Sequence, residues 1–207
     1  MMAFKGFTPD LKSVMGDGKK ETCHFVPGET KKVEKSQTAS FGFHCCEYPP
    51  TCLRYYSWPK SRFFRVEATG DIDEDDQNRI ASTEITLVEE LDAQLFAFYT
   101  MRYIIMHPRR YDWKVSEEGV TVKLDEAEAF AAEHIAIARG SSPRVRGTEG
   151  SVLGLLVESK KGIVASKLIL VNKELAGKWI MIDKDRQLHL LVETKMAYNC
   201  IWRNEHD

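Results

Sequence analysis

The sequence has no long apolar run and no strong excess of one charge. None of its segments approaches the roughly 20 consecutive apolar residues that a helix needs to cross a bilayer. Its 29 Lys and Arg residues nearly balance its 31 Asp and Glu residues, which gives a net charge of −2. These values exclude a strongly basic nucleic-acid coat protein and a whole-chain acidic mimic of DNA. With 43% hydrophobic residues, the chain is also too apolar for a disordered tail.

Sequence motifs for common cofactors and metals are missing as well. The chain contains neither the GxxxxGK[ST] nor the GxGxxG pattern, and it has no CxxC pair. Its five cysteines are an odd number, which is untypical of a disulfide framework. The first residues, Met1–Phe7, are too few and too mixed in character for an export signal. We therefore predict a cytoplasmic protein with reduced thiols, no membrane span and no cofactor.

The nearly balanced charges are unevenly distributed along the chain. Residues 1–68 carry +4, residues 69–92 carry −8 and residues 93–207 carry +2. The central acidic side chains are Asp73, Glu74, Asp75 and Asp76. Such a segment can compete for a basic groove on a partner. The alternative is a solvated turn followed by an acidic first turn of a helix.

The first half of the chain predicts short strands separated by turns. Alternation of apolar and polar residues predicts strands over residues 3–7, 41–46, 62–68 and 83–88. A hairpin is predicted between residues 22–26 and 31–35, because Pro and Gly lie between them. A short helix is predicted to begin near Pro49 and to end near Pro59.

The clearest helix signal covers residues 89–106. The apolar residues at three- and four-residue spacing are Leu91, Leu95, Phe98, Met101 and Ile105. This spacing predicts one amphipathic helix that packs against the core. Glu89, Glu90 and Asp92 are expected in its first turn, and Pro108 is expected to end it.

The second half of the chain returns repeatedly to alternation combined with glycine. Gly140, Gly147 and Gly154 are seven residues apart, which is typical of the strand-and-turn repeat of a small solenoid-like segment. The Ala and Glu residues of 125–139 favour a helix instead, so both alternatives stay open.

The last third predicts a β-meander. Its expected strands cover residues 151–158, 163–171, 178–183 and 188–193, and residues 196–202 are expected to close the sheet. The whole chain is therefore predicted to be a β-rich α+β protein. We expect an N-terminal α+β domain over residues 1–113 and a β-rich domain over residues 114–207.

The densest group of reactive side chains consists of His44, Cys45, Cys46 and Cys52. In a strand, His44 and Cys46 share one face and Cys45 points to the opposite face. This spacing is unsuited to a zinc site, so we predict that no metal is bound. A Cys–His nucleophile would need a third, orienting group, and spacing alone identifies none. The catalytic residues therefore stay unassigned.

A second candidate site lies in a loop rich in glycine and serine. Its arginines are Arg139, Arg144 and Arg146. Guanidinium groups match the geometry of phosphate oxygens, so this loop is a candidate for nucleic-acid or partner binding. If Arg144 and Arg146 lie on a strand, both project from the same face. Basic and aromatic residues also interleave at 60–65 and 102–113, where we expect the aromatic rings to lie in the core.

Three further patterns occur in the first 70 residues. They are Phe4-Lys5-Gly6-Phe7 with Asp10-Leu11-Lys12, the Gly-Phe-His-x-Cys-Glu-x-Pro motif of Gly42–Pro49, and Tyr55-Tyr56 followed by Arg62–Glu67. On these residues the chain resembles an uncharacterised family of phage and mobile-element proteins. The resemblance covers most of residues 1–70 and, more weakly, residues 134–190. It implies a mobile-element origin and no established reaction.

A mobile-element origin and the lack of a cofactor motif favour a protein that acts by binding a macromolecule. The leading expectation is an anti-CRISPR type inhibitor that binds a host defence nucleoprotein. It would do so through the acidic segment, through the Arg139–Arg146 loop, or through both. One alternative is a small enzyme that modifies or cleaves nucleic acid or a nucleotide, using His44 with Tyr55, Glu67 or a basic loop. Another is a structural phage protein, and the oligomeric state stays open.

Overall fold

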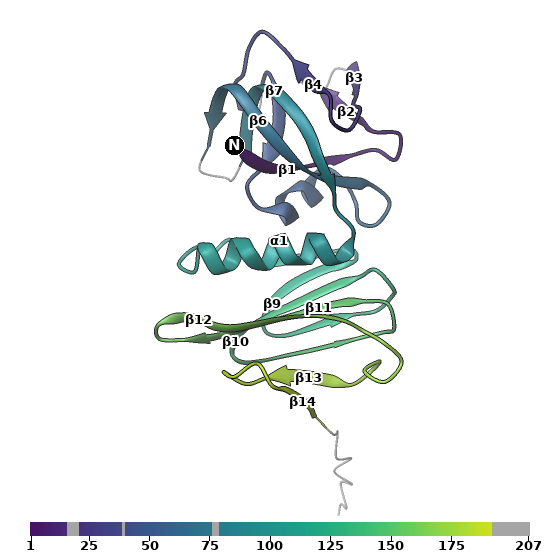
Figure 1. Cartoon of the computed structure of the whole chain (residues 1–207), viewed down its shortest axis with the longest axis vertical. Coiled ribbons are helices and arrows are strands. Elements are labelled where there is room, and N and C mark those ends of the chain that lie inside the picture. The colour runs from purple at the N-terminus through teal and green to yellow at the C-terminus, as the bar shows by residue number, and fades with distance from the viewer. Residues whose placement is uncertain (16–20, 39, 76–78, 192–207) are drawn as a thin grey trace, which may run out of the picture.

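The computed structural model consists of three parts stacked along its long axis (Figure 1). A small barrel lies at one end, a helix crosses the middle, and strands from the second half of the chain form the other end. The structure describes residues 1–15, 21–38, 40–75 and 79–191. The predicted β-rich α+β fold is confirmed, with α1 as the one α-helix of the described residues.

The N-terminal unit consists of short strands and a 3₁₀ helix. Its elements are β1 (Met2–Phe7), β2 (Lys12–Met15), β3 (Glu21–His24), β4 (Thr30–Lys32), β5 (Phe43–Cys46), η1 (Pro49–Arg54), β6 (Arg62–Glu74) and β7 (Arg79–Glu90). The strands predicted over residues 3–7, 41–46, 62–68 and 83–88 correspond to β1, β5, β6 and β7. The helix predicted near Pro49 is the 3₁₀ helix η1.

Strand pairing closes this unit into a barrel. β1 pairs antiparallel with β6 from Met2 to Phe7, β6 pairs with β7, and β7 pairs with β5. The circuit closes between β5 and β1, where one residue pair, Phe4 with Cys46, is in register. The β1–β5 seam is therefore the least extensively paired part of the barrel wall.

The predicted hairpin between residues 22–26 and 31–35 is wrong. β3 pairs with β2 in a separate two-stranded sheet, and β4 pairs with β7. The turn itself is present, because Gly28 has a φ of 83° and the amide of Glu29 donates to the carbonyl of Val26. It directs the chain onto β7, which extends beyond the end of β5 and offers free pairing positions.

Aromatic rings fill the interior of the barrel. The rings that meet edge to face, with centroids 5.0 to 5.8 Å apart, belong to Phe7, Phe25, Phe43 and Phe64. Inward-facing residues alternate along each strand, as expected for strands that bury one face. On β1 this pattern places Lys5 on the same face as the fully buried Ala3 and Phe7.

Helix α1 (Ala93–Met106) begins later than the sequence predicts. Asp92 is its N-cap, and the Asp92 carboxylate accepts a hydrogen bond from the Leu95 amide at 2.8 Å. Glu89 and Glu90 lie in β7 instead of in the first helical turn, so that prediction is wrong. The helix has the barrel on one side and the second sheet on the other (Figure 1).

The buried face of α1 also differs from the predicted one. Phe98 and Ile105 are 46% and 40% exposed, whereas Phe96 and Ile104 are buried. Phe96 packs on aromatic rings of the N-terminal unit, while Met101 faces Gly154 of the second sheet. A helix covered on two sides has no single apolar stripe, and the spacing rule assumes one.

Beyond α1, strands form a mixed sheet. They are β8 (Val115–Glu117), β9 (Val120–Ala129), β10 (Ile135–Gly147), β11 (Val152–Ser159), β12 (Gly162–Leu170), β13 (Trp179–Ile182) and β14 (Leu188–Leu191). β10 runs parallel to β9 on one side and to β11 on the other. Short connections between parallel strands are possible because these strands bend: Asp125 has a φ of 61°, and the register shifts between Arg139 and Arg144.

No solenoid is found in the described part of the chain. Gly140 and Gly147 lie within β10 and Gly154 lies within β11, so they do not form equivalent turns. They allow close approach instead: a Cβ on Gly140 would collide with the Asp125 carboxylate, and one on Gly154 would lie 2.8 Å from Ile137. Neighbouring parallel strands are offset by 15 and 17 residues instead of seven, and the antiparallel strand β12 ends the winding.

The helix considered over residues 125–139 is absent too. Ala127 and Ala129 are buried, while Glu126 is exposed and Glu128 is partly exposed. This alternation is that of a strand, and small alanines fit the tightly packed interior behind β10. Tertiary packing therefore overrides the helix propensity of Ala and Glu.

The predicted meander is correct at its first hairpin and wrong afterwards. β11 and β12 pair antiparallel, with Ser159 opposite Gly162 at the turn. β13 does not continue from β12; it pairs with β10, where Ile180 lies opposite Val145. β14 then pairs with β13. The strand predicted over residues 196–202 lies outside the described residues.

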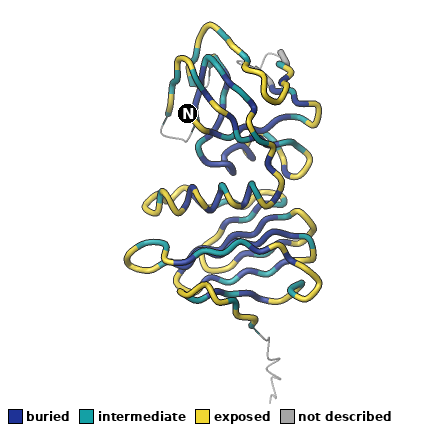
Figure 2. Tube along the Cα trace, in the orientation of Figure 1, coloured by how far each residue is buried: buried dark blue, intermediate teal, exposed yellow. Residues whose placement is uncertain are grey.

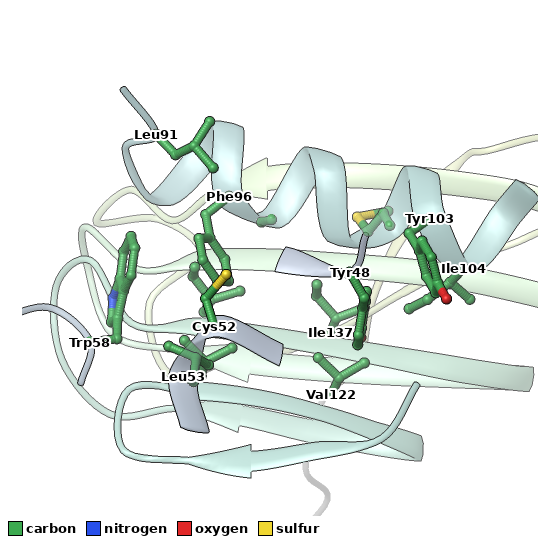
Figure 3. Close-up of a cluster of buried hydrophobic side chains, with 14 of the residues drawn as sticks. Tyr48, Cys52, Leu53, Trp58, Leu91, Phe96, Tyr103, Ile104, Val122 and Ile137 are labelled. Atoms are coloured by element: carbon green, nitrogen blue, oxygen red, sulfur yellow. The ribbon is translucent and has the colours of Figure 1, made fainter. Parts of the chain in front are cut away.

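One hydrophobic cluster connects the three parts (Figure 3). Its labelled members are Tyr48, Cys52, Leu53, Trp58, Leu91, Phe96, Tyr103, Ile104, Val122 and Ile137. The buried positions run continuously from the barrel through one side of α1 to the second sheet (Figure 2). Two hydrogen bonds add to the connection: Tyr48 donates to the Trp113 carbonyl at 2.7 Å, and Trp58 donates to the Glu133 carbonyl at 3.0 Å.

The expected division into residues 1–113 and 114–207 stays a prediction. The boundary falls in the loop between α1 and β8, and the shared cluster contains residues from both sides of it. In the described part of the chain, no helix combines the length and the apolar character needed to span a membrane.

Candidate functional site

The arginines of the predicted binding loop lie in β10. Arg139 is buried, and its guanidinium donates to both carboxylate oxygens of Glu158, with Nε 3.0 Å from Oε2. It also donates to the Pro108 carbonyl at 2.7 Å and stacks over Trp113. This side chain therefore links β10 to the segment that follows α1.

Arg144 and Arg146 project from one face of β10, as alternation predicts. Both guanidinium groups lie over the ring of Trp179, at 4.8 and 4.7 Å from its centroid. Arg144 pairs with Glu126, and Arg146 pairs with Glu128 at 2.7 Å. Both charges are thus opposed by carboxylates of the neighbouring strand, and a role in binding stays a prediction.

The predicted acidic site lies at the β6–β7 end of the barrel. Asp73 and Glu74 are at the end of β6 and Asp75 follows them, while Asp76 lies outside the described residues. The Asp73 carboxylate accepts hydrogen bonds from the amide and hydroxyl of Thr38, which lower its pKa. Its function in binding also stays a prediction.

The basic and aromatic stretch of residues 60–65 is structural. Phe63 and Phe64 are buried in the two cores that meet at β6, as expected from the sequence. The intervening arginines pair across to β7: Arg62 binds Glu90 through two hydrogen bonds of 2.6 Å, and Arg65 binds Glu89 at 2.9 Å.

A cavity of about 460 Å³ lies at the β1–β5 seam of the barrel. Its lining residues come from β1, β5, η1 with the segment after it, and β7. They are Phe4, Lys5, Gly6, His44, Cys45, Cys46, Cys52, Tyr55, Tyr56 and Arg79. The structure therefore brings together the Lys-Gly, His-x-Cys and Tyr-Tyr patterns that are separate in the sequence.

Lys5 is the most unusual residue of this cavity. Its side chain is buried, and its Nζ donates to the His44 carbonyl at 2.8 Å, on the side of β5 that faces β1. The Phe7 ring centroid lies 5.5 Å from Nζ. No carboxylate of the described residues pairs with this ammonium group, and its burial lowers the pKa of Lys5 from its ordinary value of 10.5.

His44 faces the cavity as a neutral imidazole at pH 7. Burial, followed by the charge of Lys5, lowers its pKa from the ordinary value of 6.5. Its Nε2 is buried and has no hydrogen-bond partner among the described residues. An unpartnered ring nitrogen in a cavity wall can accept or donate a proton to a bound group.

The three cysteines of the cavity differ in environment. Cys45 points into the barrel with Phe43, opposite Cys46, which confirms the predicted alternation along β5. Burial raises the pKa of Cys45 to about 12, so this thiol stays protonated. Cys46 instead lies against Cys52, whose thiol hydrogen-bonds to it and lowers the pKa of Cys46.

The cavity is bounded by tyrosines and an arginine. Tyr55 is 59% exposed and stands at the rim. Tyr56 lies directly on Gly6, where a Cβ would be 2.5 Å from its ring. The guanidinium of Arg79 binds Asp75, with Nε 2.7 Å from Oδ2, and also hydrogen-bonds to Tyr55.

The sequence identified only part of this site. His44, Cys46 and Tyr55 were candidate functional residues on chemical grounds, whereas Lys5 and Arg79 were not. The signal for Lys5 was its position between Ala3 and Phe7, since a lysine at an inward strand position is rare unless it has a specific role. Arg79 carried no such signal, because its place at the cavity depends on how β7 pairs with β5.

Residues 1–98 match a family described as a domain of unknown function, DUF7666. The match covers the barrel, the whole cavity and the beginning of α1. It includes all the patterns on which the sequence resembles phage and mobile-element proteins, but it carries no link to a phage or a mobile element. No curated protein and no solved structure matches the chain.

The DUF7666 match contains no metal-binding cluster in its described part. Among all described residues, no three His, Cys, Asp or Glu side chains are grouped so that they could hold a metal ion. The chemistry on which a proposal can rest is therefore that of the ammonium, imidazole, thiol and phenol groups around the cavity.

Proposed function

We propose that the cavity of the DUF7666 segment binds a small anionic ligand of the nucleotide type. The observation that carries this proposal is the ammonium group of Lys5, which is buried at the cavity without a carboxylate partner. Burial of an unpaired charge is costly, and an anionic group bound nearby would offset that cost. Phosphate is the anion that best fits two cations, Lys5 and Arg79, in one cavity wall.

The other lining groups support a ligand with an aromatic part. Pockets for such ligands have volumes of about 300 to 1,000 Å³, and this cavity falls within that range at about 460 Å³. Tyr55 offers an exposed ring at the rim, and nucleobases stack well on tyrosine rings. His44 supplies a hydrogen-bonding nitrogen that is unused among the described residues.

The same residues support a catalytic role on that ligand, as expected for the enzyme alternative. A neutral His44 can accept a proton from water or from a ligand hydroxyl. Glu67 does not take part, because it is exposed on β6 and does not line the cavity. We expect His44→Ala to retain ligand binding and to lose any turnover of the bound nucleotide.

Thermal unfolding with a panel of probes tests the binding proposal. Inorganic pyrophosphate, AMP, ATP and NAD are added separately to wild type, Lys5→Met and Arg144→Gln. A ligand present at 100 times its Kd stabilises the native state by about 2.7 kcal/mol. The unfolding temperature of wild type and Arg144→Gln should rise with at least one nucleotide, whereas Lys5→Met should not respond. A response to pyrophosphate alone would assign the site to free phosphate compounds. No response, or an equal response in Lys5→Met, contradicts the proposal.

A second proposal retains the mobile-element accessory role in the cytoplasm, with a host defence nucleoprotein as the partner. It is supported by the acidic side chains that gather at the β6–β7 end of the barrel, opposite the end that contacts α1 (Figure 1). Exposed carboxylates there, such as Asp71 and Glu74, can face a basic groove.

Co-purification with a Cas effector, with and without its guide RNA, tests this second proposal. The double variant Asp71→Asn/Glu74→Gln should weaken capture, while Lys32→Met at the neighbouring barrel edge should not. If wild type captures no effector and gives phage or plasmids no protection, the accessory role as an inhibitor is wrong.

A further inference from the structure

We propose that Cys46 and Cys52 form a reactive dithiol that exchanges with small-molecule disulfides. Cys46 is the attacking sulfur and Cys52 is the resolving sulfur. The proposal goes beyond the binding function above, because it holds whether or not the cavity takes an anionic ligand. It rests on the placement of two thiols and three cations around one cavity.

The fold brings the two thiols together through a short connection. Cys46 is the last residue of β5 and Cys52 lies in η1, and both line the cavity while being only 5% and 3% exposed. The Cys52 sulfur lies 3.4 Å from the Phe4 carbonyl oxygen and within hydrogen-bonding distance of the Cys46 sulfur. Phe4 is itself the residue that pairs with Cys46 at the seam. Both thiols are therefore held at the same point of the barrel wall.

The charges around the pair distinguish Cys46 from Cys52. Positive charges reach Cys46 from three elements: Lys5 on β1, Arg54 on η1 and Arg79 on β7. Together with the hydrogen bond from Cys52, they lower the pKa of Cys46, while that of Cys52 is raised by the same hydrogen bond and by burial. A thiolate beside cations, with a protonated thiol next to it, is the arrangement of a nucleophilic and resolving pair.

The exchange balances with a small-molecule disulfide as the oxidant. The Cys46 thiolate attacks one sulfur of the disulfide RSSR, which forms a Cys46–SR mixed disulfide and releases RS⁻. Cys52 then loses its proton and attacks the Cys46 sulfur, which releases the second RS⁻. The two protons of the protein thiols end on two RSH molecules. The protein dithiol is oxidised to one disulfide and RSSR is reduced to two thiols.

The remaining described cysteines provide internal comparisons. Cys45 follows the same strand, but its thiol points into the barrel and its pKa is raised to about 12. Cys23 lies on β3 in the separate two-stranded sheet and does not line the cavity. Selective reaction at Cys46 would therefore reflect the cavity and its cations instead of general thiol reactivity.

Oxidised glutathione and peptide mass spectrometry test the proposal on the native full-length protein. Wild type should form the Cys46–Cys52 disulfide. Cys52→Ser should accumulate a glutathione adduct on Cys46, and Cys46→Ser should form no adduct on Cys52. Cys45→Ser is the matched control and should behave as wild type. Near-ultraviolet circular dichroism establishes that each variant is folded.

Alkylation by iodoacetamide provides a second readout without variants. The rate at Cys46 should follow a titration with a midpoint below the ordinary thiol value of 9.0, because only the thiolate reacts. At neutral pH, each unit of lowering raises the thiolate fraction about tenfold. The proposal is overturned if glutathione adds first to Cys52 or Cys45, if the disulfide fails to form, or if Cys46 alkylation titrates at or above 9.0.

Discussion

A lysine ammonium among aromatic rings must be compensated for the hydration that it loses on folding. Lys5 has one hydrogen bond to the His44 carbonyl and the nearby ring of Phe7. A full carboxylate partner is absent among the described residues, and the pKa of Lys5 falls as a result. A residue that costs stability and lines a cavity is typical of a functional site.

This cost predicts the behaviour of Lys5→Met. We expect its free energy of unfolding at pH 7 to exceed that of wild type by about 1 to 2 kcal/mol, because an apolar chain of similar length replaces a desolvated charge. The folded-state pKa of Lys5 lies below 10.5, so wild type gains stability as the pH rises between these two values. The advantage of Lys5→Met should therefore shrink toward pH 10.

Urea denaturation at pH 7, 9 and 10 measures this difference. Lys32→Met serves as the control, because Lys32 lies on an edge strand and pairs with Glu84 at the surface. Strong destabilisation of Lys5→Met at pH 7, with no dependence on pH, would instead assign Lys5 a structural role.

At the scale of single elements, β10 shows how much of a site follows from alternation alone. Its period of two correctly placed Arg144 and Arg146 on one face, as it placed His44 and Cys46 on one face of β5. Their partners were not predictable, because Glu126 and Glu128 lie on a parallel strand whose register depends on the bend in the chain. The cavity was unpredictable for the same reason, since its lining comes from elements far apart in the sequence.

The three arginines of β10 are expected to differ in their contribution to stability. Arg139→Leu should lower the free energy of unfolding by about 3 kcal/mol, because it leaves Glu158 and the Pro108 carbonyl without their buried donor. Arg144→Leu should cost less than about 1 kcal/mol, because that side chain and its partner are largely exposed. Urea denaturation of the two variants checks the contrast, and equal effects would contradict it.

At the scale of the whole molecule, the predicted fold class is correct but the connections between strands are not. Periodicity identified the β-rich character, the helix and the β11–β12 hairpin. It could not identify the closure of the barrel or the parallel β9–β10–β11 order, because both depend on contacts between distant segments. The central cluster around Phe96 depends on the same long-range contacts.

The shared cluster predicts that the barrel and the second sheet unfold together. Phe96 is fully buried and packs on Trp58 and Phe63 of the N-terminal unit, while the same cluster includes Ile137 of β10. Phe96→Ala should cost about 3 to 5 kcal/mol. Differential scanning calorimetry should show one transition that shifts as a whole, with exposed Phe98→Ala as the control. Two transitions, of which one is unaffected by Phe96→Ala, would contradict a shared core.

The titration of the Lys5 ammonium group tests the central claim most directly. Nuclear magnetic resonance of the lysine side chains, with Lys5→Met used for assignment, gives its pKa in the free protein and in the presence of ATP or inorganic pyrophosphate. We predict a pKa below 10.5 in the free protein and a rise when one of these anions binds, because an anion stabilises the charged form. An ordinary pKa in the free protein, or one that neither anion changes, would contradict the assignment of this cavity as an anion-binding site.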